Sequence, residues 1–226
     1  MIALTIGCAL ACAMLVVAEW RGLARLRIAA KLVGSAAFVA AGALALALGR
    51  GGEIGAGHMQ LGRAIVTGLV LGALGDACLL ARGRRWFLAG LVAFLLGHLA
   101  YVAGIAMVEP AERWAGDAGW LAAVPAGAGL AVLAVLWPRL GSLRVPVIAY
   151  VATISVMVIA AIAAARGAAL PDPARGRLVT GASAFFVSDL AVARDRFVAA
   201  RFANKLWGLP AYYAGQILLA WSITGA

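Results

Sequence analysis

The 226-residue chain is 65% hydrophobic and only 12% charged, with a mean hydropathy of +1.01. A soluble domain carries about 25% charged residues, so this composition excludes an ordinary soluble protein and predicts a polytopic membrane protein. The net charge of +10 does not indicate nucleic-acid binding, because the basic residues separate apolar runs and form no patch interleaved with aromatic residues.

Apolar segments long enough to span about 30 Å of hydrocarbon occur eight times. They predict an all-α, polytopic integral membrane bundle of eight transmembrane helices, forming a single domain over residues 1–226. The expected spans cover residues 2–18, 28–49, 62–81, 86–107, 119–137, 144–165, 176–193 and 207–224. The first span is expected to be retained as a helix, because no basic residues precede it and no clear cleavage site follows it.

The distribution of basic residues predicts the topology. Thirteen of the nineteen Lys and Arg residues fall in the first, third, fifth and seventh connections between spans. Because cytoplasmic connections carry the excess of Lys and Arg, we expect these four connections in the cytoplasm and both termini on the non-cytoplasmic side. The membrane is expected to be a bacterial inner membrane.

Two aspartates interrupt the apolar runs, Asp76 in the third span and Asp189 in the seventh. Asp76 shares a helix face with Gly68 and Gly72 at spacings of i, i+4 and i+8. Glycines on a membrane helix let another helix approach closely, so this face is expected to turn Asp76 into a helix–helix interface. An ionisable residue within a membrane span marks a functional site by default.

A weak internal repeat relates the two aspartates. Residues 74–82 resemble residues 187–194, and each segment is followed in the next span by a glycine and a polar residue, at 97–98 and 215–216. Four spans in each half preserve the orientation of the helices, so a parallel 4+4 duplication fits, with coincidence as the alternative.

A polar pocket is expected around the aspartates. At 1.5 Å per residue, Asp76 and Asp189 lie roughly 8–9 Å below the cytoplasmic basic residues, and His98 and Gln216 lie deeper. The residues expected to bind substrate there are His98, Tyr101, Tyr212, Gln216, Ser188, Arg82 and Arg194. The structural alternatives are a salt bridge from each aspartate to Arg82 or Arg194 and a simple interhelical hydrogen bond from His98. Lys31 is interpreted as a snorkelling anchor and Glu19 as an interfacial residue.

Several motifs occur in an order that suggests a family. They are Gly75–Asp76, Phe94–Tyr101 (FLLGHLAY), Ser188–Asp189, Arg196–Phe197 and Tyr212–Gln216 (YYAGQ). Over nearly the whole chain, their order and spacing resemble the lysoplasmalogenase (YhhN-like) family of membrane proteins. The chain departs from that family's frequent Lys–Pro pair at the start of the second span, since Lys31 precedes Leu32.

The resemblance implies hydrolysis of the vinyl ether bond of lysoplasmalogen to a fatty aldehyde and glycerophosphoethanolamine or glycerophosphocholine. That chemistry needs one proton donor and one carboxylate, roles that stay open between Asp76 and Asp189, and no metal or cofactor. The expected partners are the lysophospholipid substrate, with its phosphate at Arg82, Arg194 or Arg196, and membrane lipids. The alternative is a small proton-coupled transporter that uses the same carboxylates.

Overall fold

The computed structural model describes residues 1–49, 56–167 and 170–224, and the regular elements in these ranges are all helices. The long helices are α1 (Ile2–Arg21), α2 (Ala24–Gly49), α3 (Ala56–Leu80), α4 (Arg84–Ala106), α6 (Ala123–Leu140), α7 (Arg144–Arg166), α8 (Asp172–Phe197) and α9 (Phe202–Trp221). Short helical turns form the remaining elements, namely η1 (Ala111–Arg113), α5 (Trp114–Ala118), η2 (Gly119–Ala122) and η3 (Gly141–Leu143).

Each predicted span overlaps one long helix, which confirms the all-α class. By length and composition, six helical segments qualify as candidate membrane spans: α1, α2, α3, α4, the segment Ala111–Arg166 that contains α6 and α7, and α8. Large apolar side chains such as Leu10, Val92 and Leu130 are exposed on the outside of the bundle, as lipid-facing residues are. The protein is therefore an integral membrane protein, and the arrangement with eight crossings stays a prediction.

Helices α8 and α9 extend further than the apolar runs that predicted them. Helix α8 begins at Asp172, four residues before the predicted span, and Pro173 in its first turn suits that start. Helix α9 begins at Phe202, five residues early, so that Lys205 belongs to the helix and not to a loop. Long basic side chains can bury their methylene stems and keep the charge in water, so a helix need not end where the apolar sequence ends.

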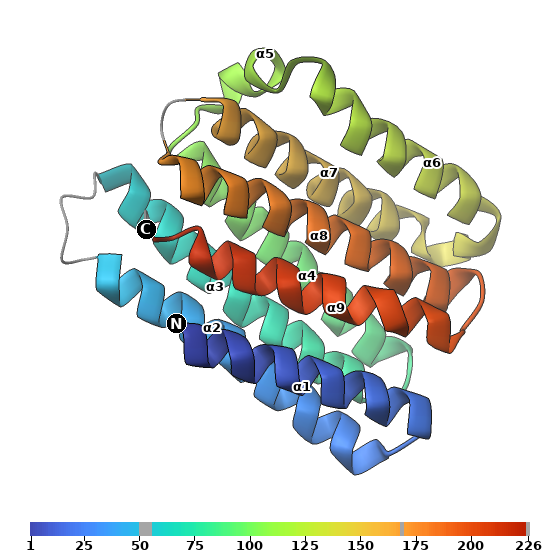
Figure 1. Cartoon of the computed structure of the whole chain (residues 1–226). Helices are drawn as coiled ribbons and strands as arrows, with labels where there is room; N and C mark the ends of the chain where they lie inside the picture. Colours follow the sequence, from blue (N-terminus) through green and yellow to red (C-terminus); the bar gives the residue numbers. More distant parts are fainter. Residues whose placement is uncertain (50–55, 168–169, 225–226) are drawn as a thin grey trace.

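Seven of the long helices form a closed ring. Helices α1, α2, α3, α4, α7, α8 and α9 pack against one another in that order, and α9 returns to α1. Helix α6 packs outside the ring against α7 and α8, at the edge of the bundle in Figure 1. The predicted 4+4 repeat is not confirmed. In a duplication α6 would be the counterpart of α1, but α1 lies in the ring and α6 lies outside it.

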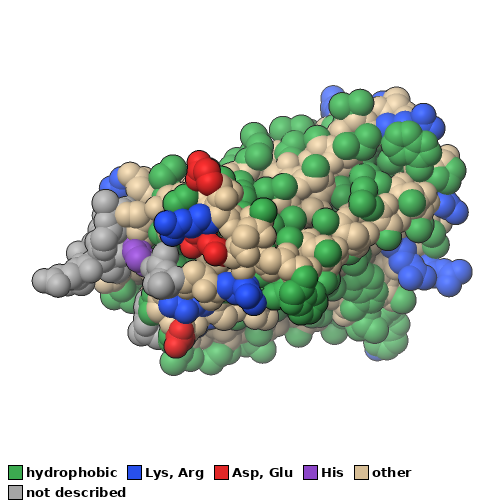
Figure 2. Space-filling view, turned by 90° about the horizontal axis from the view of Figure 1, so that it is seen from above, with side chains coloured by type: hydrophobic (Ala, Val, Ile, Leu, Met, Phe, Trp, Pro, Cys, Tyr) green, Lys and Arg blue, Asp and Glu red, His purple; other side chains and the backbone are tan. Residues whose placement is uncertain are grey.

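The basic connections gather at one end of the bundle. The links from α1 to α2, α3 to α4, α6 to α7 and α8 to α9 lie at the same end, opposite both termini (Figure 1). Figure 2 shows Lys and Arg side chains at both ends of the bundle and hydrophobic side chains along its length, and the Asp and Glu side chains visible on this face lie at the end opposite the basic connections. The helices thus alternate in direction as the charge pattern requires.

The glycine face of α3 packs as its spacing predicted. A Cβ atom on Gly68 would overlap the Tyr101 ring of α4, and one on Gly72 would meet Gln216 of α9. Asp76, on the same face, is 1% exposed. The prediction that this face turns the aspartate into a helix–helix interface is confirmed, and the interface involves two different helices.

Candidate functional site

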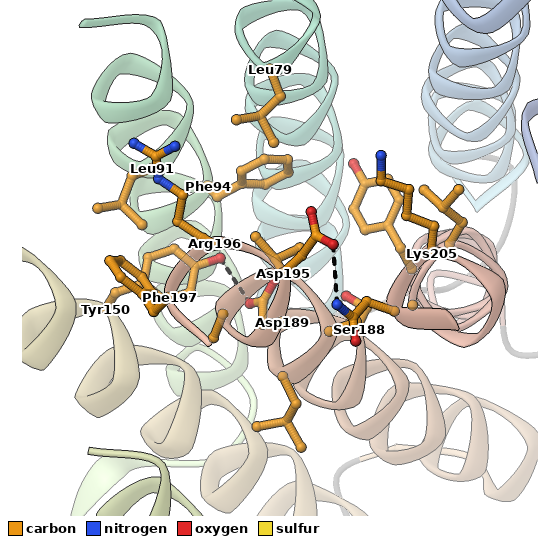
Figure 3. A pocket seen from close by; sticks show the side chains of 18 of the residues that line it. Leu79, Leu91, Phe94, Tyr150, Ser188, Asp189, Asp195, Arg196, Phe197 and Lys205 are labelled. Carbon is orange, nitrogen blue, oxygen red and sulfur yellow. Dashed lines mark hydrogen bonds between the residues drawn. The ribbon is translucent and has the colours of Figure 1, made fainter. Parts of the chain in front are cut away.

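A cavity of about 560 Å³ lies within the bundle toward its basic end and reaches both aspartates. Figure 3 shows the Tyr150 hydroxyl in hydrogen-bond contact with Asp189 at the wall of this cavity, with Phe94 and Leu91 on the neighbouring α4. Most of its lining is aliphatic or aromatic. The polar and charged residues that line it are Glu19, Arg27, Lys31, Asp76, Tyr150, Ser188, Asp189, Asp195, Arg196, Asn204, Lys205 and Tyr212.

Asp76 is held by three donors from two neighbouring helices. Lys31 Nζ lies 2.6 Å from Asp76 Oδ1, and the lysine side chain is only 13% exposed. Ser35 Oγ and Tyr212 Oη donate hydrogen bonds to Asp76 Oδ2 over 2.6 and 2.9 Å. The interpretation of Lys31 as a snorkelling anchor is therefore wrong, as is the alternative of an Asp76–Arg82 salt bridge. Helix α2 begins at Ala24, which places Lys31 two turns inside the helix, where it faces Asp76 instead of the surface.

A buried hydrogen-bond chain supports Asp76 from behind. Tyr101 Oη donates to Gln216 Oε1 over 2.8 Å, and Gln216 Nε2 donates to Tyr212 Oη over 3.2 Å. Tyr101 is 1% exposed and Gln216 is fully buried, and neither residue lines the cavity. These two residues therefore position Tyr212, which does reach the cavity.

Asp189 has different surroundings. Tyr150 Oη donates a hydrogen bond to Asp189 Oδ2 over 2.8 Å, and His98 Nε2 lies 3.9 Å from the same oxygen. Within the described ranges, no lysine or arginine forms an ion pair with Asp189, so the predicted alternative of a bridge to Arg194 is wrong. His98 is fully buried against the rings of Phe185 and Tyr150, and neither of its ring nitrogens has a hydrogen-bond partner among the described residues.

The cations that line the cavity are not all those expected. Arg82 and Arg194 are exposed and do not line it, whereas Arg27, Arg196 and Lys205 do. Arg196 also lies over the Phe87 ring, with its guanidinium carbon 4.4 Å from the ring centroid.

Two acids accompany these cations at the opening. Glu19, interpreted from sequence as interfacial, lines the cavity and forms an ion pair with Lys205 at 2.8 Å. Asp195 accepts a hydrogen bond from Asn204 Nδ2 over 3.1 Å. The rim of the cavity thus carries charges of both signs at an end of the bundle that is otherwise basic.

Ser35 and Tyr150 are site residues that were not predicted from the sequence, and Lys31 was predicted with a different role. Lys31 and Ser35 are four residues apart in an apolar run, so they share a helix face, and that spacing is a signal for a polar site. Tyr150 is a single tyrosine in an apolar helix and offers no such signal. Ser188 was expected beside Asp189, and it lines the cavity while its hydroxyl donates to the Phe185 carbonyl over 2.8 Å.

Metal ligation was not expected from the two histidines of the sequence. Among the described residues, no group of three or more His, Cys, Asp or Glu side chains is placed to hold a metal ion. Asp76 and Asp189 have lysine, serine and tyrosine partners, which are hydrogen-bond and charge partners suited to proton transfer.

The fold and the cavity define an integral membrane protein of the helical-bundle type with a buried acidic site. The chain belongs to the YhhN family, whose model matches residues 35–223. A protein named lysoplasmalogenase from Mycobacterium bovis is 34% identical over 172 residues, which cover 70% of this chain and 59% of that protein. Lysoplasmalogenase TMEM86A from Bos taurus is 34% identical over 163 residues, which cover 70% of this chain and 64% of that protein. The aligned part thus spans about three fifths of these relatives, and no solved structure matches the chain.

Proposed function

We propose that the protein hydrolyses the vinyl ether bond of lysoplasmalogens, releasing a fatty aldehyde and glycerophosphoethanolamine or glycerophosphocholine. One observation carries this proposal: in this YhhN-family bundle, Asp76 and Asp189 line the same cavity, they have different hydrogen-bond partners, and the rest of the lining is mostly apolar. The curated relatives named lysoplasmalogenase support it.

The chemistry matches the groups in the cavity. Acid hydrolysis of a vinyl ether begins with proton transfer to the β-carbon, which leaves an oxocarbenium ion that water then attacks. One carboxylic acid can donate that proton, and one carboxylate can stabilise the cation and accept a proton from the water. Asp76 and Asp189 are our candidates for these two roles, and the scheme requires neither metal nor cofactor.

The shape and charges of the cavity suggest how the lipid lies. We propose that Arg27, Arg196 and Lys205 meet the phosphate at the basic end, because guanidinium and ammonium groups bind phosphate well. The vinyl ether is joined directly to the glycerol and therefore lies just beneath the phosphate, at the depth of the aspartates. The alkenyl chain then follows the aliphatic and aromatic lining of the cavity, past Phe94 and Leu91.

The membrane arrangement is part of the proposal. We infer eight crossings, with the basic end in the cytoplasm and both termini on the other side, because the excess of Lys and Arg marks cytoplasmic connections. The substrate then enters from the cytoplasmic leaflet. Tyr101 and Gln216 act from behind the cavity wall, where their hydrogen bonds orient Tyr212, and His98 lies beside Asp189 with its Nε2 atom 3.9 Å from Oδ2.

Aldehyde release tests the activity. The purified protein in lipid vesicles is given a lysoplasmalogen with EDTA present, and the released aldehyde is measured by mass spectrometry as its hydrazone. We expect aldehyde and glycerophospho-alcohol in equal amounts, and none from the 1-acyl lysophospholipid used as control. Vesicles that release no aldehyde would show the proposed activity to be wrong, and substrate-dependent proton uptake in the same vesicles would then favour the transporter.

A further inference from the structure

We propose that Lys31 is a positioning residue that fixes Asp76 as the carboxylate of the site and thereby leaves Asp189 as the proton donor. The inference rests on the proposed function and deepens it, since it assigns the two aspartates to separate steps. Among the described residues, Asp76 has a largely buried lysine as its partner and Asp189 has no lysine or arginine partner, a difference that the sequence does not reveal.

Every polar contact of Asp76 makes this residue an acceptor. The Lys31 ammonium group can only donate hydrogen bonds, and its Nζ atom lies 2.6 Å from Asp76 Oδ1. Ser35 and Tyr212 occupy Oδ2 as donors. The donor direction of Tyr212 is set in turn, because its oxygen already receives a hydrogen bond from Gln216 Nε2. Before the reaction starts, a proton on Asp76 would have to displace one of these donors and would leave Lys31 as an unpaired charge in a largely buried position, which is costly, so the carboxylate is the resting form.

Asp189 has room for a proton. Its Oδ2 atom has Tyr150 as a donor at 2.8 Å, with His98 Nε2 at 3.9 Å, while no hydrogen bond joins its Oδ1 to another described residue. No lysine or arginine of the described ranges compensates a negative charge on it. The surrounding cavity wall includes Phe186 and Leu190, which offer no charge compensation either. The Asp189 side chain is only 18% exposed, so the neutral acid is the form that avoids an unpaired charge at this largely buried position, and it is the form that can protonate carbon.

The assignment gives a balanced reaction. Asp189 transfers its proton to the β-carbon, where the π electrons form the new C–H bond and leave the oxocarbenium ion beside the Asp76 carboxylate. Water adds to the cationic carbon while Asp76 accepts one of its protons, which gives a hemiacetal. Asp189 then accepts the hemiacetal hydroxyl proton and Asp76 returns its proton to the departing glycerol oxygen, so that both acids recover their initial states and the aldehyde is released.

Infrared spectroscopy reads the two protonation states without turnover, so it decides the assignment separately from the proposed activity. We compare the purified wild-type protein with Asp189→Asn and Asp76→Asn at neutral pH. The carboxylic acid C=O band should be lost in D189N and kept in D76N. Loss of the band in D76N, or no loss in either variant, would overturn the assignment.

Kinetics test the role of Lys31 against a matched lysine. Lys31→Met should lower kcat by about 10²-fold, within the range of general acid–base effects, with little change in KM. The kcat of Lys31→Arg should be at least tenfold higher than that of Lys31→Met, because arginine keeps the positive charge beside Asp76. Lys205→Met removes the other lysine of the cavity, which pairs with Glu19 and not with Asp76, and it should raise KM more than it lowers kcat.

The kinetic outcomes separate positioning from binding and from folding. If K31M raised KM and left kcat unchanged, Lys31 would be a phosphate ligand and the proposal would be wrong. Ser35→Ala removes an uncharged donor from Asp76 and keeps the ion pair, so it supplies a second variant should K31M not fold. S35A should lower kcat severalfold at constant KM, and an unchanged kcat would contradict the proposed state of Asp76.

Discussion

The backbones of α8 and α9 approach so closely at Gly181 and Gly215 that neither position has room for a methyl group. A Cβ atom on Gly215 would lie 3.0 Å from the Gly181 carbonyl oxygen and 3.0 Å from the Phe185 backbone nitrogen. Ordinary contacts begin at 3.4 Å, and backbone atoms cannot rotate away, so Gly215→Ala must push the helices apart by about 0.4 Å. Overpacking of this kind costs about 1–3 kcal/mol, so we expect G215A to lower the free energy of unfolding by about 2 kcal/mol.

Thermal unfolding of the detergent-purified protein measures this loss. A cost of about 2 kcal/mol corresponds to a Tm lower by roughly 4–8 °C for a chain of this size. The matched control is Gly127→Ala in α6, where an added Cβ would have no atom within 4 Å and the change should be neutral or slightly stabilising. If G215A and G127A unfolded at the same temperature, the close approach of α8 and α9 would be refuted.

Three further predictions follow from the site and its surroundings. Asp76→Asn and Asp189→Asn should each lower kcat for aldehyde release by about 10²–10⁴-fold, and normal turnover of either variant would remove that residue from the mechanism. Arg196→Gln should raise KM more than the matched Arg194→Gln, because Arg196 lines the cavity and Arg194 does not; the reverse order would place the phosphate at Arg194. At the end of the bundle opposite the basic connections, burial and the charge of Asp117 raise the pKa of Glu109. Because a raised pKa in the folded state makes stability fall as the pH rises through it, Glu109→Gln should raise Tm at pH 8 and not at pH 4, and equal effects at both would contradict this.

The positions of the long helices could be predicted because each depends on a local property, an apolar run of membrane-spanning length. Their ends could not, since Lys205 and Arg196 belong to helices that continue past the apolar sequence. The packing of Gly68 and Gly72 was also predictable, because three residues on one face of a single helix determine it. The exclusion of α6 from the ring depends on contacts between distant segments, and no local pattern specifies them.

The residues of the site likewise fall into those that the sequence predicts and those that it does not. The two aspartates were recognised because a carboxylate in an apolar run is conspicuous whatever the fold. Their partners were not, since Lys31 meets Asp76 across 45 positions of sequence and Tyr150 meets Asp189 across a helix–helix interface. The two aspartates look equivalent in sequence, and the three-dimensional arrangement makes them different.

Hydrolysis of a lysoplasmalogen in D₂O tests the central claim most directly, because proton transfer to carbon leaves a permanent mark on the product. The aldehyde is reduced in place by alcohol dehydrogenase, which prevents later exchange, and the alcohol is analysed by mass spectrometry. We expect one deuterium on C2 of the alcohol, the former β-carbon of the vinyl ether, which lies next to the carbon that bears the hydroxyl group. No carbon of the glycerophospho-alcohol should carry deuterium. An alcohol without that deuterium would contradict acid-catalysed vinyl ether hydrolysis by this protein.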